Sequence, residues 1–309
     1  MPSAITNGAR IRTNTPAENA YNALELASQN IATRQLRLST GKRINTAADD
    51  VAGYITSRAL QARNGTLKAA LNAVGDAQNT ATIAQDGLAN IADLMTQIKD
   101  AAASASSGAL GTDEKVALAK AAYRLAQQIQ TVVDSTTFAG RTLLDSGFSG
   151  DFIIGSTNTN GMITIGIDLT TNNSDFNVAG AFDVKASSAT NFAGVTGLNL
   201  VGLNSVTSSA LGIFSSANIN TTLTSLSSAL NNVNKVASYI GGVVGRLNSQ
   251  EEVLKTQITN YNAAISRIED ADVATEQLQL VRAQFLQQAS LTSLAQANQA
   301  PQGFLQLFR

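Results

Sequence analysis

The stretch LKAALNAVGDAQNTATIAQDGLANIADLMTQIKDAA at residues 67–102 decides the fold. Apolar or small residues recur in it at alternating steps of three and four, at Leu67, Ala70, Val74, Ala77, Ala81, Ala84, Leu88, Ile91, Met95, Ile98 and Ala102. This spacing places one continuous apolar stripe along a helix and is typical of a coiled coil. The sequence therefore predicts a long helix whose stripe packs against other helices.

Two other segments carry stripes that can meet this helix. After a turn marked by Gly108 and Gly111, a helix that starts near Thr112 carries a second stripe, at Leu118, Ala122, Leu125, Ile129 and Val132. A third stripe, far along the chain, lies at Leu247, Leu254, Ile258, Tyr261, Ile265 and Ile268. Because stripes from both halves must pack together, we expect a mainly α fold, a long antiparallel coiled-coil-like helical rod formed by both chain ends.

The middle of the chain has a different character. Residues 151–155 and 162–169 are β-rich and flank the turn-forming residues 156–161, which predicts a β-hairpin, and residues 182–186 predict a further strand. Residues 170–217 are dense in Gly, Asn, Ser and Thr. They predict a small β/loop-rich inserted tip at the surface, with a flexible linker as the alternative.

The two ends are unusual for a soluble monomer. Residues 277–309 contain only two charged residues, yet apolar residues recur at helical spacing, at Leu278, Val281, Phe285, Leu291 and Leu294, followed by Phe304, Leu305, Leu307 and Phe308. Residues 18–40, with Leu24, Ala27, Ile31 and Leu38, can cover only one side of such a helix. We infer that other subunits complete the burial of the termini.

The composition excludes several kinds of chemistry. The chain has no Cys and no His, so it holds no thiol nucleophile, imidazole base, disulfide or ordinary zinc site. Asp49 and Asp50 are adjacent at an expected helix start and point apart, unlike the facing carboxylates of a glycosidase. No phosphate-binding glycine loop is visible. We expect no enzyme activity, no metal and no cofactor.

Charge and hydropathy narrow the partners. The net charge of −1 argues against nucleic-acid binding, and polar residues interrupt every apolar run before it reaches a membrane span. The first 20 residues hold no apolar run typical of a secretory signal. Residues 1–68 nevertheless carry nine Lys and Arg residues against four Asp and Glu residues. A surface-displayed module for acidic polysaccharide is therefore one alternative function.

Two short motifs join the ends to the rod. In LSTGKRINTAADD at residues 38–50, Gly41 can end a helix, and Thr46 followed by Asp49 resembles a capping box that starts the next helix. In SRIEDAD at residues 266–272, the acids lie near this basic cluster if the ends pair. The plainer interpretation is helix punctuation with solvated charges.

At these motifs the chain resembles bacterial flagellin. RLSTGKRINTAADDVAGYITSR at residues 37–58 is similar to the family's N-terminal pattern, and SRIEDAD at 266–272, FLQQA at 285–289 and LAQANQAPQ at 294–302 are similar to its C-terminal pattern. The likeness covers roughly residues 11–169 and 218–309. The hook–filament junction proteins share the paired-helix plan, but the tail at 294–299 resembles filament flagellin more closely.

The resemblance implies a subunit that polymerises into the extracellular flagellar filament. Residues 1–45 and 270–309 would form the inner tube, 46–169 and 218–269 the outer tube, and 170–217 a surface insertion. The residues expected at subunit contacts are Leu24, Ile31, Leu38, Arg43, Asp49, Asp50, Asp270, Asp272, Leu278, Val281, Phe285, Leu291 and Leu294. The implied partners are other copies of the chain, an export chaperone, the filament cap protein and hook–filament junction proteins, with export through the flagellar type III apparatus and no cleaved signal.

Two departures from the family pattern matter. The start is extended, with Met1–Arg10 before a run at residues 11–14 that reads Ile-Arg-Thr-Asn. Gln97 stands where many flagellins carry an arginine recognised by a vertebrate Toll-like receptor. The resemblance therefore gives no ground to expect recognition by that receptor.

Overall fold

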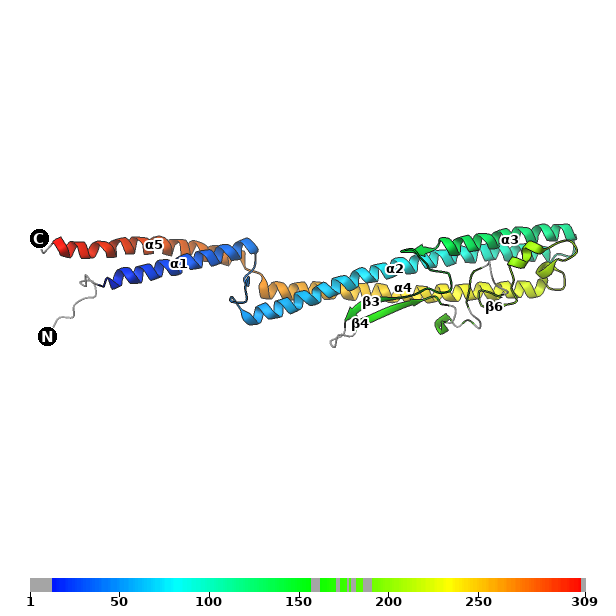
Figure 1. Ribbon diagram of the computed structural model, residues 1–309, viewed down its shortest axis with the longest axis horizontal. Coiled ribbons are helices and arrows are strands. Elements are labelled where there is room, and N and C mark those ends of the chain that lie inside the picture. The colour runs from blue at the N-terminus through cyan, green and yellow to red at the C-terminus, as the bar shows by residue number, and fades with distance from the viewer. Residues whose placement is uncertain are drawn as a thin grey trace. The chain divides into compact units, whose positions relative to one another are not determined.

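A computed structural model of the protein describes residues 13–156, 162–170, 173–176, 178, 182–185 and 191–306. These residues are mainly helical, as predicted, and their long helices are α1 (Thr15–Thr40), α2 (Val51–Ala105), α3 (Thr112–Ser135), α4 (Ile219–Glu269) and α5 (Val273–Gln306) (Figure 1). The chain divides into two compact units, unit 1 with residues 1–64 and 259–309 and unit 2 with residues 65–258. The extended start at residues 1–10 lies outside the described residues.

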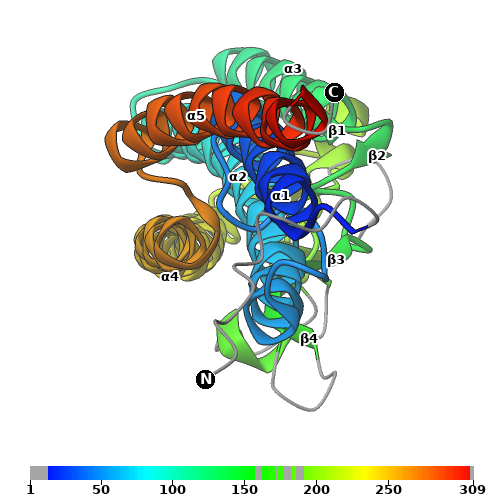
Figure 2. The same cartoon turned by 90° about the vertical axis from the view of Figure 1, so that its left-hand side faces the viewer.

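Unit 1 is built on the antiparallel pair of α1 and α5. The two helices lie side by side, as the end-on view in Figure 2 shows. Asn14 caps α1 by accepting a hydrogen bond from the backbone N–H of Ala17, and its side-chain amide donates to the carbonyl of Ala297 near the far end of α5 (2.9 Å). Gln287 of α5 donates to the hydroxyl of Ser28 (3.2 Å). The ends of the chain therefore pair, as the sequence predicts.

The core of unit 2 follows the predicted stripe along α2. Every residue of that stripe from Leu67 to Ala102 is buried. Of the second stripe, Ala122 and Ile129 are buried as predicted, whereas Ala119, Ala126 and Val133 are buried in place of Leu118, Leu125 and Val132. The leucines expected at the seam are only half-buried. Small side chains let the two helix backbones approach closely, and the larger ones then flank the contact.

The third stripe begins earlier than the sequence indicates, and its last four predicted residues, Ile258, Tyr261, Ile265 and Ile268, are only half-buried. The buried face of α4 begins at Ile219 and continues to Leu254, through residues at the same alternating spacing, at Thr222, Leu226, Ala229, Val233, Val236, Ile240, Val243 and Leu247. The first half was missed because residues 219–234 are rich in Ser, Thr and Asn, which are weak helix formers. Burial of the apolar stripe overrides this local preference.

The predicted hairpin is present. Strands β3 (Ser149–Ser156) and β4 (Met162–Asp168) pair antiparallel, with an irregularity between Ile153 and Gly155. Of the turn expected at residues 156–161, Ser156 instead ends β3, and residues 157–161 lie outside the described residues. The hairpin runs along α4 (Figure 1), whose Gln250 donates to the carbonyl of Ile154 (3.2 Å).

Two smaller hairpins were not predicted. Strands β1 (Thr137–Phe138) and β2 (Arg141–Thr142) flank Ala139-Gly140, and β5 (Asn191–Phe192) and β6 (Val195–Thr196) flank Ala193-Gly194. All four turn residues have positive φ, between 48° and 79°. Two successive residues with positive φ form the two-residue turn that matches the twist of a hairpin. The tripeptide Phe-Ala-Gly, which occurs at both turns, was the sequence feature that indicated them.

The described part of residues 170–217 is packed against the helices. It forms short 3-10 turns at Ser174–Phe176, Val201–Ser205 and Gly212–Phe214 and buries apolar side chains, among them Phe176, Phe192, Leu203, Val206 and Phe214. Hydrogen bonds tie it to α4, from Asn232 to the carbonyl of Ala193 (2.8 Å) and from Thr222 to that of Ile213 (2.7 Å). These described parts do not behave as a flexible linker.

The strand predicted at residues 182–186 is wrong over its described part. Phe182–Lys185 is irregular although Phe182 and Val184 are both buried. The carbonyl of Asp183 accepts from the backbone of Ala193 (2.7 Å), so this segment holds the β5–β6 turn and does not extend a sheet.

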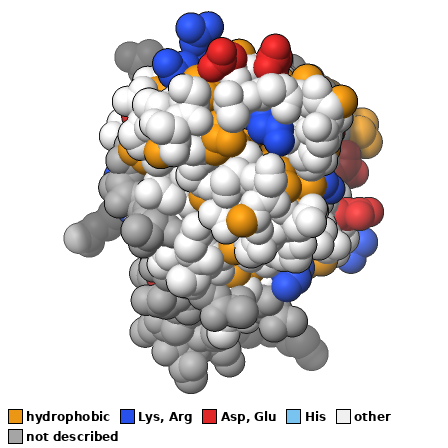
Figure 3. Space-filling view, turned by 90° about the vertical axis from the view of Figure 1, so that its right-hand side faces the viewer, with side chains coloured by type: hydrophobic (Ala, Val, Ile, Leu, Met, Phe, Trp, Pro, Cys, Tyr) orange, Lys and Arg blue, Asp and Glu red, His pale blue; other side chains and the backbone are white. Residues whose placement is uncertain are grey.

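Seen from the end where α3 and α4 begin, unit 2 presents mostly uncharged side chains and backbone (Figure 3).

Candidate assembly surfaces

The turn between α1 and α2 is fixed by local capping. Gly41 ends α1 in the left-handed conformation (φ 69°), as predicted. The helix after it begins later than the predicted capping box, at Val51. Asp50 is its N-cap and accepts from the backbone N–H of Gly53 (3.0 Å), whereas Asp49 closes the preceding turn by accepting from the backbone and hydroxyl of Thr46 (2.9 and 3.1 Å).

Backbone pairing joins this turn to the segment between α4 and α5. Lys42 and Asp270 form an isolated antiparallel bridge, the N–H of Arg43 donates to the carbonyl of Glu269 (2.6 Å), and the N–H of Ala271 donates to that of Gly41 (2.9 Å). The guanidinium of Arg43 also donates to the carbonyl of Ile268 (2.8 Å). The two sequence motifs therefore meet within one chain.

Ion pairs surround this junction. Lys42 pairs with the buried carboxylate of Glu269 (3.3 Å), and Arg37 lies 3.7 Å from Asp49. Arg34 and Arg37 both reach Glu276 in the first turn of α5, at 2.7 and 3.4 Å. Glu276 was not predicted from the sequence, although it is the only acid within the described α5 and lies at the positive end of that helix.

Of the other expected acids, Asp50 and Asp272 act through side-chain hydrogen bonds, and Asp270 acts through its backbone in the bridge to Lys42. No ion pair is found among the described residues for Asp50, Asp270 or Asp272. Asp272 caps α5 by accepting from the backbone of Ala274 (3.0 Å) and the hydroxyl of Thr275 (2.8 Å). The hydroxyl of Thr275 and then the backbone donors hold the pKa of Asp272 below its usual value. The backbone N–H groups of Thr46 and Asn45 do the same for the pKa of Asp49.

The apolar residues of α1 and α5 lie on two faces. Toward the partner helix, Ala20, Ala27 and Ala283 are buried, and the predicted residues Leu24, Ile31, Leu38 and Leu294 are half-buried. The other four predicted residues of α5 are exposed, with exposed fractions of 72% for Leu278, 55% for Val281, 69% for Phe285 and 50% for Leu291. Of the five predicted residues of α5, only Leu294 faces α1, so they do not form the single stripe that was expected.

The exposed face of α5 is apolar enough to need a partner. It includes Val273 and Leu286 beside the four residues above, and α1 adds exposed Tyr21, Leu26 and Leu36. The side chains of Phe304 and Leu305 lie outside the described ones, as do residues 307–309. So many large apolar side chains exposed on two neighbouring helices mark an interaction site.

Other kinds of site are not found among the described residues. They hold no cluster of Asp and Glu that could bind a metal ion. Of their helices, none combines the length and hydropathy that a membrane span needs.

Comparison with known proteins decides the family. Residues 11–148 match the bacterial flagellin N-terminal helical region, and residues 223–308 match the bacterial flagellin C-terminal helical region, so the two matches cover well over half of the chain. The chain belongs to the bacterial flagellin family. Its function is therefore that of a structural subunit of the flagellar filament, which lies outside the cell.

Relatives of this flagellin match it over nearly its whole length. The flagellin of Bacillus subtilis is 29% identical, with 97% of this chain and 100% of the relative covered, and that of Halalkalibacterium halodurans is 28% identical, with 97% and 99% covered. Flagellin FlaB1 of Treponema pallidum is 26% identical over 88% of this chain and 90% of its own. The crystal structure of Bacillus cereus flagellin is 19% identical, with a TM-score of 0.43, 62% of this chain covered and 93% of that one.

Proposed function

We propose that α1 and α5 of this flagellin form the innermost layer of the filament, where the exposed face of α5 packs against neighbouring subunits. The observation that carries the proposal is the exposure of Leu278, Val281, Phe285 and Leu291 on a helix with few charges. Complete burial of each such side chain stabilises by about 1.5–3 kcal/mol. A helix that leaves four of them in water gains this energy only by association.

The remaining layers follow from the same reasoning. In this proposal residues 46–169 and 218–269 form the outer tube around residues 1–45 and 270–309, and residues 170–217 face the solvent. The low charge of α5 supports an inner position, because a water-excluding layer between subunits penalises unpaired charges. The two compact units divide after Asn64 within α2 and after Ile258 within α4, later than the first proposed boundary and earlier than the second.

The junction supports a positioning role for its charged residues. Arg43, Asp49, Asp50, Asp270 and Asp272 all hold the ends of helices or the backbone bridge between the two motifs. They would set the direction in which α1 and α5 leave the junction. This direction determines how the exposed side of α5 meets neighbouring subunits. A change in this direction repeats in every subunit, so that small energies have a large effect on the lattice.

The finer partners also belong to this proposal. As the family resemblance implies, the chain would be exported through the flagellar type III apparatus without a cleaved signal, escorted by an export chaperone. It would then add below the cap protein, on a base of hook–filament junction proteins. The alternative of a polyanion-binding module gains no support, since Arg34, Arg37 and Lys42 are engaged in ion pairs with acids of the same chain.

The test is a point substitution in the exposed face. Phe285→Ser removes an aromatic side chain that is largely exposed in the single chain, so we expect the monomer to keep its helicity. The variant should lose the ability to extend filament seeds, because truncating a central interface residue weakens binding by about 2–4 kcal/mol. Gln279→Ser, also exposed on α5 but on another side of the helix, is the matched control and should polymerise. Seeded growth is measured by light scattering and electron microscopy.

A deletion gives the independent second result. Removal of residues 278–309 should leave unit 2 folded and soluble, because its stripes pack within one chain, and should abolish polymerisation. Ordered filaments from either the deleted chain or the Phe285→Ser variant would contradict the proposed inner layer.

A further inference from the structure

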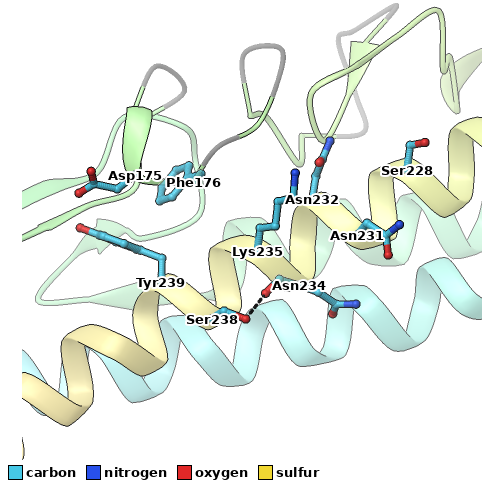
Figure 4. A pocket seen from close by; sticks show the side chains of 9 residues that line it. All are labelled: Asp175, Phe176, Ser228, Asn231, Asn232, Asn234, Lys235, Ser238 and Tyr239. Atoms are coloured by element: carbon cyan, nitrogen blue, oxygen red, sulfur yellow. Dashed lines mark hydrogen bonds between the residues drawn. The ribbon is translucent and has the colours of Figure 1, made fainter.

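The side chains that line the hollow beside α4 in unit 2 do not converge. The amides of Asn231 and Asn234 point away from its aromatic end at Tyr239 (Figure 4). A binding pocket needs polar groups that meet at one ligand, so this hollow is not a candidate site. A polar contact with an unusual acceptor lies instead in unit 1, at the end of the α1–α5 pair that is remote from the junction.

Pro301 interrupts the backbone hydrogen bonding near the C-terminal end of α5. In an α-helix the N–H of each residue donates to the carbonyl four positions earlier, and proline has no N–H to donate. The carbonyl that loses its helical donor in this way is that of Ala297. It does not lie among the last four carbonyls of the helix, where a missing donor is usual, because α5 continues to Gln306.

Asn14 supplies a donor to this carbonyl from the other helix. Its side-chain Nδ2 donates to the carbonyl oxygen of Ala297 at 2.9 Å, a normal hydrogen-bond distance. The oxygen of the same side chain accepts from the backbone N–H of Ala17 (3.2 Å) and caps the start of α1. Both polar atoms of one amide are therefore used, one within α1 and the other across the pair. Aspartate or serine would serve as the cap, but an ionised aspartate has no donor and serine is shorter.

The surrounding contact between α1 and α5 is made by small side chains. Near its start α1 turns Ala17 and Ala20 toward α5, and the facing residues of α5 include Ser290 and Ala297. Such side chains bury little apolar area. A directed hydrogen bond therefore contributes a large share of the free energy that holds the start of α1 against α5.

We propose that Asn14 and Pro301 form a clasp that closes the α1–α5 pair at the end remote from the junction. Pro301 leaves one carbonyl of α5 without its helical donor, and Asn14 pairs with that carbonyl at the point where α1 begins. The clasp thereby anchors the start of α1 at one defined position along α5. It lies within a single chain, so it does not depend on the proposed inner layer.

The test is a double-mutant cycle in assembled filaments, read by hydrogen exchange with mass spectrometry over the first turns of α1. Asn14→Ser keeps an N-cap acceptor and removes the amide that reaches α5. We expect exchange in these turns to become about two- to tenfold faster, as the loss of one hydrogen bond implies. Asn22→Ser removes the same amide from an exposed position of α1 and is the matched control, which should leave this exchange unchanged.

Pro301→Ala provides the second side of the cycle. Residue 301 then donates its own N–H to the carbonyl of Ala297, so that this acceptor no longer depends on Asn14. We expect the effect of Asn14→Ser to fall below about twofold in this background, because its loss leaves no unsatisfied acceptor. This non-additivity distinguishes a clasp from a plain helix cap, which acts equally with either residue at position 301.

A variant that does not polymerise alone is assembled as a minor fraction with the unsubstituted chain, from which the mass of its N-terminal peptide separates it. Exclusion of Asn14→Ser from such mixed filaments, relieved by Pro301→Ala, would support the clasp as the cycle does. Unchanged exchange in Asn14→Ser, equal effects in both backgrounds, or exclusion that Pro301→Ala does not relieve would overturn it. Filament growth by Phe285→Ser would contradict the inner layer and leave the clasp standing.

Discussion

At Gly87 the buried face of α2 has no room for a side chain. A Cβ there would lie 2.8 Å from Cδ1 of Leu144 and 2.9 Å from Oγ1 of Thr136, at the end of α3. We expect Gly87→Ala to destabilise the chain by about 1–3 kcal/mol through overpacking, although alanine favours a helix by about 1 kcal/mol. Gly75→Ala is the matched control, because its Cβ meets nothing within 4 Å.

The control substitution should stabilise by up to about 1 kcal/mol through the same helix preference. Urea unfolding followed by circular dichroism measures both. Equal effects of the two substitutions would show that the approach of Leu144 and Thr136 to α2 does not constrain residue 87.

Acid should loosen the junction through Asp272. Its folded pKa lies below the unfolded value of about 3.9, so its stabilising effect is complete above that value and is lost as the pH falls through the folded pKa. Asp272→Asn keeps an N-cap acceptor without a titrating group. We expect this variant to match the unsubstituted chain at neutral pH and to show a shallower loss of α5 protection below about pH 4.

Amide exchange of residues 274 and 275 as a function of pH checks this. Asp272→Ala, which removes the cap, should exchange faster at every pH. An unchanged acid profile in Asp272→Asn would assign the pH dependence to Asp49, whose pKa is also lowered.

The roles of individual junction residues could be predicted only in part from the sequence. Gly41 was predicted because its type and position fit a helix end, and the backbone geometry follows from that. Glu276 was missed because a single acid in a helix gives no pattern, and its partners Arg34 and Arg37 lie more than 200 positions away. Such pairings depend on which helices meet, which the local sequence does not contain.

At the scale of elements, the α1–α5 pair is much less well buried than the helices of unit 2. The buried apolar side chains of this pair are small, Ala20, Ala27 and Ala283, whereas α2 buries a complete stripe that includes Leu88, Ile91 and Met95. We expect backbone amides of α1 and α5 to exchange with solvent far faster than those of α2 to α4 in the monomer, and to become protected in the filament.

Hydrogen exchange with mass spectrometry on monomer and filament measures this difference. The α2 peptides around Leu88 are the internal control, since unit 2 packs without neighbours and should be protected in both states. Equal protection of α5 and α2 in the monomer would mean that the terminal helices are stable alone.

The elements themselves were predicted best where one periodic pattern decided them. The stripe at 67–102 was correct at every position because an unbroken heptad leaves one choice of face. The start of α4 was missed because the tertiary packing of Leu226 and Val233 overrides weak helix formers. The small hairpins escaped because their strands have two residues each and are defined by their turns.

At the scale of the molecule, residues 170–217 separate stability from assembly. They lie outside both family matches, so we expect a filament lattice without them. They also bury Phe176, Phe192 and Phe214 against the helices, so their removal exposes apolar surface on α3 and α4. Replacing them with a short Gly/Ser linker should lower the unfolding midpoint of the monomer and still allow seeded filament growth.

Newly uncovered apolar surface in that variant can cause disordered aggregation, which resembles polymerisation in light scattering. Electron microscopy distinguishes the two, and Phe285→Ser added to the linker variant is the control that should abolish ordered filaments only. If the linker monomer folds and never forms filaments, the inserted segment makes lattice contacts and does not face solvent alone. If filaments form, the stability that this segment adds to unit 2 is separable from the contacts that α1 and α5 make between subunits.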